Sequence, residues 1–260
     1  MAVRVLPARA LAACLALLAV PAMSPQSSPA TGTASGLSPS ETLSYSIEWR
    51  LIYAGSARMS LAPQAAQQSE SKLHLESGGL VSKLYKIEDN YRVQMHDQFC
   101  ASNSVFDAVE GKRHRETVVT FDRNAHKATY LERDLLKNAV IHRAETEIPP
   151  CVSDIVGGLY KLRTIHLEPG QTAQLAVSDG KKSVSAKVEA QDREQVQTKA
   201  GTFKTVRYEV YVFNGVLFKK SGRLQLWVTD DSRRMPVQFR ARMAFPIGSI
   251  TFQLDKEEHS

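Results

Sequence analysis

Residues 206–215 read VRYEVYVFNG, and apolar side chains occupy every second position as far as Val212. A period of two is typical of a half-buried β-strand, because successive side chains point to opposite faces of a sheet. The Asn214-Gly215 pair that follows predicts a hairpin turn, since both central residues of such a turn need positive φ. The alternating residues 224–228 would then form the return strand. This segment therefore predicts an antiparallel sheet.

The same period recurs along most of the chain. Pro236 opens another alternating run, and Asp179-Gly180 predicts a further hairpin. Before Gly55, residues 43–53 read LSYSIEWRLIY, and one face of this run would carry Tyr45, Ile47, Trp49, Leu51 and Tyr53. Counting the alternating runs predicts roughly 10–14 strands. So many sequential hairpins favour a curled or barrel-like sheet, because closure removes exposed edges.

One segment departs from this period. After a pair of prolines, either Ser153 or Asp154 can cap a helix whose apolar face would be formed by Ile155, Val156, Leu159, Tyr160 and Leu162. Gly157 and Gly158 would each weaken an isolated helix by about 1 kcal/mol relative to alanine, so their presence predicts close packing against the sheet. The predicted fold class is therefore all-β, a curled or barrel-like antiparallel sheet with one short helix.

The N-terminus predicts export. Residues 1–22 have the order of a secretory signal peptide, because Arg4 and Arg9 precede an apolar run that ends in small residues. That run, residues 10–20, is too short for the roughly 20 residues that cross a bilayer, so we expect no transmembrane anchor after processing. The predicted location is the periplasm.

A membrane-anchored lipoprotein is the alternative. Leu11-Ala-Ala-Cys14 resembles a bacterial lipobox, in which the cysteine is lipidated. The apolar stretch before Cys14 is shorter than the roughly 7–15 residues of a usual h-region, which favours soluble export. Residues 23–40 are rich in Ser, Pro and Gly and predict a disordered tether. We expect a single β-rich domain over residues 41–260.

The charge of the chain does not indicate a nucleic-acid-binding protein. The sequence has 33 Lys and Arg against 27 Asp and Glu, and loss of Arg4 and Arg9 with the leader would leave 31 against 27. Basic pairs such as Lys181-Lys182 are scattered beside turns, whereas nucleic-acid binding needs a concentrated basic stripe. Weak attraction to anionic lipid headgroups or cell-wall polymers remains open.

The cysteines predict a disulfide. Once Cys14 leaves with the leader, Cys100 and Cys151 remain in an oxidising compartment, where pairing is the default. Their separation along the chain implies a loop-closure stabilisation of about 4 kcal/mol. A metal site is the rival interpretation, but the two are not in CxxC spacing and no HExxH motif accompanies them. We expect no metal.

No catalytic motif is present. The chain lacks the G-x-S-x-G nucleophile elbow and both Gly-rich phosphate-binding motifs. Its 7 histidines are dispersed, and Asp230-Asp231 is interpreted as a turn cap rather than a carboxylate pair. Ser153, Asp154 and His166 are near in sequence, but a triad is defined by geometry. We expect a protein that is not an enzyme, with no catalytic residues and no cofactor.

Four aromatic residues form the candidate binding face. Trp49, Trp227, Tyr45 and Phe239 lie in amphipathic strands on comparable faces. Core packing is the simpler interpretation of this pattern. The functional interpretation is an apolar concavity inside a half-open barrel, where these side chains would contact a lipid or acyl chain.

Several stretches together resemble the bacterial family called domain of unknown function 3108, over about residues 43 to 254. The most specific is W-x-x-D-D-x-x-R-x-P-V, from Trp227 to Val237. The other matching positions are Tyr45, Trp49, Gly55, Asp154, Leu159-Tyr160-x-Leu162-Arg163, Pro169-Gly170, Asp179-Gly180-Lys181, Gly201-x-Phe203 and Gly248-Ser249 before Leu254. Gly157-Gly158 stands where the family would have Ser-Ala. The resemblance implies an exported β-rich fold and no established activity, so no catalytic residue is carried over.

The sequence therefore favours a non-enzymatic periplasmic envelope protein that binds a lipid or other apolar ligand in a half-open β-barrel. The alternative is a structural or interaction protein for envelope integrity, with a cell-wall polymer or a protein as its partner. The two hypotheses differ in whether the β core contains an open apolar cavity.

Overall fold

The computed structural model describes residues 37–38, 40–64, 67–244 and 248–259. The predicted signal peptide, Cys14 and most of the predicted tether lie outside the described residues. The N-terminal strands are β1 (Glu41–Trp49), β2 (Ile52–Pro63), β3 (Ser69–Ser77), β4 (Ile87–His96), β5 (Cys100–Glu110), β6 (Arg113–Asp122), β7 (Lys127–Asp134) and β8 (Ala139–Glu147). The C-terminal strands are β9 (Thr172–Ser178), β10 (Ser183–Thr198), β11 (Gly201–Val210), β12 (Gly222–Thr229), β13 (Pro236–Met243) and β14 (Gly248–His259). The helices are α1 (Gly79–Leu84), α2 (Ile155–Arg163) and the 3₁₀ helix η1 (Asp97–Phe99).

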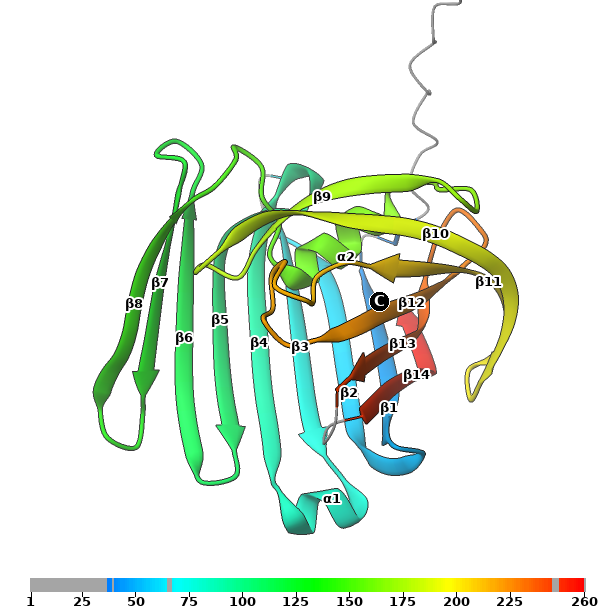
Figure 1. Ribbon diagram of the computed structural model, residues 1–260, viewed down its shortest axis with the longest axis horizontal. Coiled ribbons are helices and arrows are strands. Elements are labelled where there is room, and N and C mark those ends of the chain that lie inside the picture. The colour runs from blue at the N-terminus through cyan, green and yellow to red at the C-terminus, as the bar shows by residue number, and fades with distance from the viewer. Residues whose placement is uncertain (1–36, 39, 65–66, 245–247, 260) are drawn as a thin grey trace, which may run out of the picture. The chain divides into compact units, whose positions relative to one another are not determined.

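All of these strands form one sheet in the order β8-β7-β6-β5-β4-β3-β2-β1-β14-β13-β12-β11-β10-β9. The pairing of β1 with β14 joins the N-terminal and C-terminal hairpins, and every neighbouring pair is antiparallel. The sheet curls, so that β9 and β10 cross over the concave side of the N-terminal strands (Figure 1). The prediction of an all-β, curled antiparallel sheet is confirmed.

A short segment joins the curled sheet across its open side. The Ala101 amide donates to the Val152 carbonyl (2.9 Å), which links this segment to the start of β5. Ser153 exchanges backbone hydrogen bonds with β9, through the Ala176 carbonyl (3.0 Å) and the Ser178 amide (2.9 Å). These bonds satisfy part of the edge of β9 that would otherwise be unpaired. The segment therefore connects β5 to β9, although the strands themselves do not close into a barrel.

The predicted disulfide is present at this seam. Cys100, the first residue of β5, is bonded to Cys151, and their Cα atoms are 5.0 Å apart. Because Cys151 directly precedes the bridging segment, the disulfide fixes that segment against β5. The covalent link therefore stabilises the curl of the sheet as well as constraining the unfolded chain.

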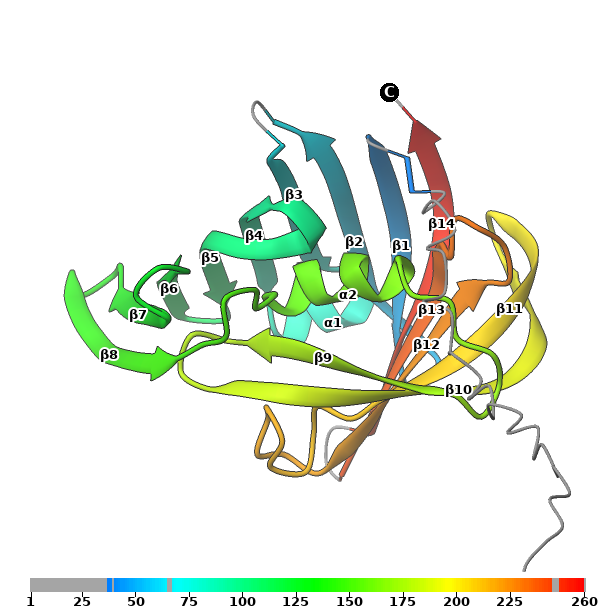
Figure 2. The ribbon, with the colours of Figure 1, turned by 90° about the horizontal axis from the view of Figure 1, so that it is seen from above.

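Helix α2 lies on the concave face, between β9 and the N-terminal strands (Figure 2). A Cβ atom at Gly157 would lie 3.0 Å from Met95 Sδ and 3.1 Å from the Phe99 carbonyl oxygen. A Cβ atom at Gly158 would lie 3.1 Å from Val177 Cγ1. The two glycines therefore allow the close helix–sheet approach that the sequence predicted. The apolar face was predicted one residue too wide, because Ile155 is 49% exposed.

The N-terminal alternating run was assigned wrongly beyond Trp49. Arg50 and Leu51 have φ values of 51° and 69°, and Trp49 pairs directly with Ile52. They therefore form a two-residue hairpin turn, in which Leu51 is 91% exposed. The alternation concealed this turn, because neither residue is the Gly or Asn that usually marks a positive φ.

The Asn214-Gly215 hairpin was also wrong in its extent. Both residues have positive φ, but β11 ends at Val210 and its partner Leu224 lies well beyond the turn. The intervening residues 211–221 form a longer loop instead of a tight hairpin. Helix α1 was not predicted either, because its six residues include none that is buried and therefore carry no apolar period.

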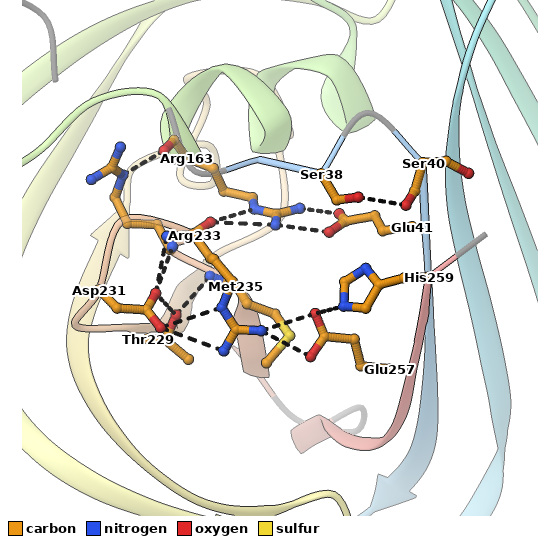
Figure 3. A network of polar contacts seen from close by, with 11 residues as sticks. Ser38, Ser40, Glu41, Arg163, Thr229, Asp231, Arg233, Met235, Glu257 and His259 are labelled. Atoms are coloured by element: carbon orange, nitrogen blue, oxygen red, sulfur yellow. Dashed lines mark hydrogen bonds and ion pairs between the residues drawn. The ribbon is translucent and has the colours of Figure 1, made fainter. Parts of the chain in front are cut away.

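A buried ion pair joins β1 to α2 (Figure 3). Arg163 donates to both carboxylate oxygens of Glu41, and the Nη2–Oε2 distance is 3.0 Å. The two side chains are 1% and 2% exposed. Arg163 also donates to the carbonyl of Arg233 in the β12–β13 turn, and Arg233 pairs with Glu257 of β14 at 3.1 Å. This network, which the sequence did not predict, holds the end of α2 to strands from both halves of the sheet.

Candidate functional site

An apolar cavity of about 290 Å³ lies on the concave side of the sheet. One part of its wall comes from α2, through residues such as Leu159 and Leu162. The sheet contributes apolar side chains from β1–β3 and β9–β14. The described residues of the lining are Tyr45, Ala57, Met59, Leu73, Ile155, Val156, Gly158, Leu159, Leu162, Leu175, Val177, Ala186, Val210, Val212, Phe213, Leu217, Phe218, Leu224, Leu226, Phe239 and Phe252.

Among these described residues, Tyr45 contributes the one side-chain polar group, its hydroxyl. This hydroxyl donates to the carbonyl oxygen of Pro236 at 2.8 Å, so its hydrogen bond is already made within the protein. Burial raises the pKa of Tyr45 well above its ordinary value, which keeps the hydroxyl neutral. A ligand in this cavity would therefore meet hydrocarbon surface without a free donor or a charge, which suits an apolar group and disfavours an ion.

Helix α2 is positioned by the buried side chain of Asp154. Its Oδ1 accepts from the Gly157 amide (2.8 Å), and its Oδ2 accepts from the Val156 amide (3.0 Å). The Tyr91 hydroxyl of β4 also donates to Oδ2, at 2.7 Å. Burial raises the pKa of Asp154, and these hydrogen bonds oppose the rise. Asp154 therefore caps the helix, as the sequence allowed, and also ties it to the sheet.

The loop between β11 and β12 completes the cavity. Val212 and Leu217 are each buried, and the rings of Phe213 and Phe218 are 5.6 Å apart. All four residues line the cavity. The sequence reasoning missed this loop, although the apolar run 216–218 directly after Asn214-Gly215 was a usable signal, since an exposed hairpin turn is usually polar.

The structure brings together two of the four predicted aromatic residues. Tyr45 and Phe239 line the cavity with their rings 5.5 Å apart in an edge-to-face arrangement. Trp227 follows Leu226 on β12 and so points to the opposite face, where the guanidinium of Arg240 lies 5.2 Å from its ring centroid. Trp49 lies outside the lining at the end of β1, with the Arg50 guanidinium 5.3 Å from its ring.

The described part of the chain contains no group of three or more His, Cys, Asp or Glu residues that could hold a metal ion. Asp231 accepts hydrogen bonds from the Arg233 and Arg234 amides at 3.0 and 3.2 Å, which confirms that this carboxylate caps the β12–β13 turn. Within the same residues, no helix is both long enough and apolar enough to cross a membrane.

The fold and the cavity define a class: β-barrel-like proteins built from one curled antiparallel sheet with an apolar interior. The chain belongs to the family described as protein of unknown function, DUF3108, whose model matches residues 44–255. This agrees with the resemblance found in the sequence. No curated protein matches the chain.

Several solved structures are similar to this one. A β-barrel-like protein of the DUF1849 family from Brucella abortus aligns with a TM-score of 0.58 and 8% identity, over 86% of this chain and 99% of that chain. At this identity the likeness shows the fold alone. A DUF1089 family protein from Pseudomonas aeruginosa aligns with a TM-score of 0.36 and 13% identity, over 70% of this chain and 87% of that chain. A protein from Bacteroides fragilis, inferred to be exported and of YmcC-like fold, aligns with a TM-score of 0.32 and 8% identity, over 85% of this chain and 97% of that chain.

Proposed function

We propose that this protein is a non-enzymatic, exported envelope protein that binds an apolar or amphipathic ligand in the cavity between α2 and the curled sheet. The observation that carries the proposal is the chemistry of the lining. In the part of the lining that the structure describes, the one polar side-chain group is the Tyr45 hydroxyl, which already donates to the Pro236 carbonyl. An apolar cavity of this kind favours a hydrocarbon group over water.

The size of the cavity supports a modest ligand. Its volume of about 290 Å³ is at the lower limit of the roughly 300–1,000 Å³ of small-molecule pockets. A single alkyl chain is therefore a better fit than a lipid with several chains. The N-terminal sequence pattern of residues 1–22 is the support for export and a periplasmic location.

Two measurements test the proposal. Native mass spectrometry of the protein isolated from its own envelope should detect a bound amphiphile. The purified protein should also enhance the fluorescence of N-phenyl-1-naphthylamine, a neutral apolar probe. Ala57→Leu on β2 and Ala186→Leu on β10 each place a larger apolar side chain in the cavity. Each should weaken probe binding at least 10-fold, because the filled volume leaves too little space for the probe.

The control is Ala125→Leu, which adds the same atoms in the exposed β6–β7 turn and should leave probe binding unchanged. Thermal unfolding of each variant separates a filled cavity from a lost fold. Equal probe binding by the wild type and both filled variants would contradict a ligand in this cavity.

A second candidate is an interaction protein that supports envelope integrity. It is favoured by exposed apolar side chains near the β7–β8 hairpin, where Leu136 is 66%, Val140 48% and Ile141 42% exposed. Val140 and Ile141 belong to the edge strand β8 and Leu136 lies in the turn before it, and an edge strand can accept a further strand from a partner. A photoreactive residue at position 141 should capture a defined protein in intact cells and lose it on Val140→Asp, whereas capture unchanged by this substitution would count against the site.

A further inference from the structure

A second hollow adjoins the apolar cavity on the same concave face. It is a cleft of about 450 Å³ lined by inward-facing residues of β4–β7 and by the β9–β10 turn. Ile155 and Phe218 line both hollows, so the two meet at these side chains. The exposure of Ile155, at the first position of α2, follows from this place between them.

The cleft differs from the cavity in its chemistry. Hydroxyl groups line it, among them Tyr91, Ser104, Thr117 and Tyr130. Its charged residues are Glu110, Arg115, Glu132, Asp179 and Lys181. An apolar hollow that continues into a polar, charged one matches a molecule with a hydrocarbon tail and a polar head.

The charges nearest the β9–β10 turn form a connected row. Lys181 Nζ lies 3.5 Å from the Tyr130 hydroxyl, which donates to Glu132 Oε2 at 3.1 Å. Glu132 Oε1 in turn pairs with Arg115 Nη1 at 2.9 Å. Glu132 therefore pairs with Arg115 alone, and among the described residues no carboxylate forms an ion pair with Lys181. The row has a net positive charge, which favours an anion.

Among the described residues, neither of the two other carboxylates of the cleft forms an ion pair with Lys181. Asp179 Oδ1 accepts from the backbone amides of Lys181 and Lys182 at 2.9 and 2.8 Å, so the turn fixes the orientation of this carboxylate, which keeps its negative charge. Glu110 is the last residue of β5, six residues along the strand from Ser104, the register partner of Val119. Because each residue of a β-strand advances the chain by about 3.3 Å, Glu110 lies roughly 20 Å along the sheet from Val119, the residue on which the β9–β10 turn packs.

The position of Lys181 is built into the fold. Gly180 has a φ of +85°, and a Cβ atom there would lie 2.6 Å from Val119 Cγ1 and 3.2 Å from Tyr130 Cδ2. Only glycine lets the turn approach β6 and β7 this closely. The Lys181 ammonium is thereby held over the Tyr130 ring, 4.6 Å from its centroid.

We propose that the ligand is a single-chain amphiphile with an anionic head, either a carboxylate or a phosphate. Its alkyl tail occupies the apolar cavity, and its head binds Lys181 in the adjoining cleft. This inference rests on the proposed function, because it assigns the head to a molecule whose tail fills the cavity.

The test compares three probes that share one alkyl chain: dodecan-1-ol, dodecanoate and dodecyl phosphate. Each displaces N-phenyl-1-naphthylamine from the purified full chain at one fixed ionic strength. We expect at least one of the anionic probes to bind roughly 10-fold more tightly than the alcohol, since a charge-assisted hydrogen bond contributes about that factor. Lys181→Ala should remove this preference and leave alcohol binding unchanged. Which anionic probe is preferred identifies the head as carboxylate or phosphate.

The matched control is Lys137→Ala, which removes the same charge from the exposed β7–β8 turn and should preserve the preference. If all three probes bind equally, or if the preference survives in Lys181→Ala, the assignment of the head is overturned while the apolar site stands. If none of the probes binds the wild type, the proposed function itself fails.

Discussion

The buried Glu41–Arg163 pair allows a stability prediction that depends on tertiary structure alone. Glu41→Gln keeps the size of the side chain but removes the charge that balances the Arg163 guanidinium. At 1% exposure this guanidinium has no access to water, and its remaining hydrogen-bond acceptor among the described residues is the Arg233 carbonyl. A buried cation would therefore lose its counter-ion without gaining hydration.

Removing one partner of a buried pair costs about 3–5 kcal/mol. Since domains of ordinary stability unfold with about 5–15 kcal/mol, this loss is a large fraction of the total. The substitution should lower the stability of the fold and leave ligand binding unchanged, because neither Glu41 nor Arg163 lines the cavity. Urea unfolding followed by circular dichroism measures it as a lower midpoint with an unchanged slope.

The matched control is Glu258→Gln in β14, next to β1. Glu258 pairs with Arg58 at 3.0 Å, but the two side chains are 37% and 61% exposed. An exposed pair contributes about 0–1 kcal/mol, so this substitution should have little effect. The double variant Glu41→Leu/Arg163→Met should cost less than the two single changes added together, because no charge is then left buried. Equal costs for Glu41→Gln and Glu258→Gln would refute the reasoning.

Three further predictions concern other parts of the sheet. Reduction of the Cys100–Cys151 disulfide, separated by 51 residues, should lower the free energy of unfolding by about 4 kcal/mol in guanidinium titrations, and an unchanged midpoint would contradict its role at the seam. Burial, and to a smaller extent the negative charge of Glu110, raises the pKa of Asp89 to about 6. The folded state therefore binds this proton more tightly than the unfolded state, and the free energy of unfolding should fall as pH rises from about 4 to about 6. Asp89→Asn should remove that fall and stabilise the protein by about 1 kcal/mol at alkaline pH, a value reduced for partial exposure; equal pH profiles for both proteins would disprove this assignment. Gly180→Ala should cost about 1–3 kcal/mol more than Gly170→Ala in thermal unfolding, because both have left-handed φ but only the first would clash with a neighbour, and equal costs would exclude the tight packing of this turn.

The fold class followed from local chemistry. Alternation of side chains along a strand is a property of the backbone, so the runs at 206–212 and 236–243 predicted strands without any tertiary knowledge. The cap at Asp154 and the Asp179-Gly180 turn were likewise local, since each depends on hydrogen bonds or φ values within a few residues. The disulfide followed from the two cysteines that remain if the predicted leader is removed.

The candidate site could be predicted only in part. Alternation divides a strand into two faces but does not say which face becomes concave, so Trp227 was grouped with Phe239 although it points away. The loop that carries Phe213 and Phe218 was taken for a short turn, because its burial depends on the curl of strands far away in sequence. Neither the cavity nor the cleft is a property of one segment.

By itself, the sequence determined the strands, their antiparallel order of hairpins and the cysteine pair, because these depend on the backbone period, on turn residues and on residue counts. The tertiary structure alone decided the contact between Glu41 and Arg163, which are 122 residues apart, and the meeting of an apolar cavity with a charged cleft at Ile155 and Phe218. The physical reason is that the curvature of a sheet arises from the packing of all its strands and of α2, and no local pattern in the chain encodes it.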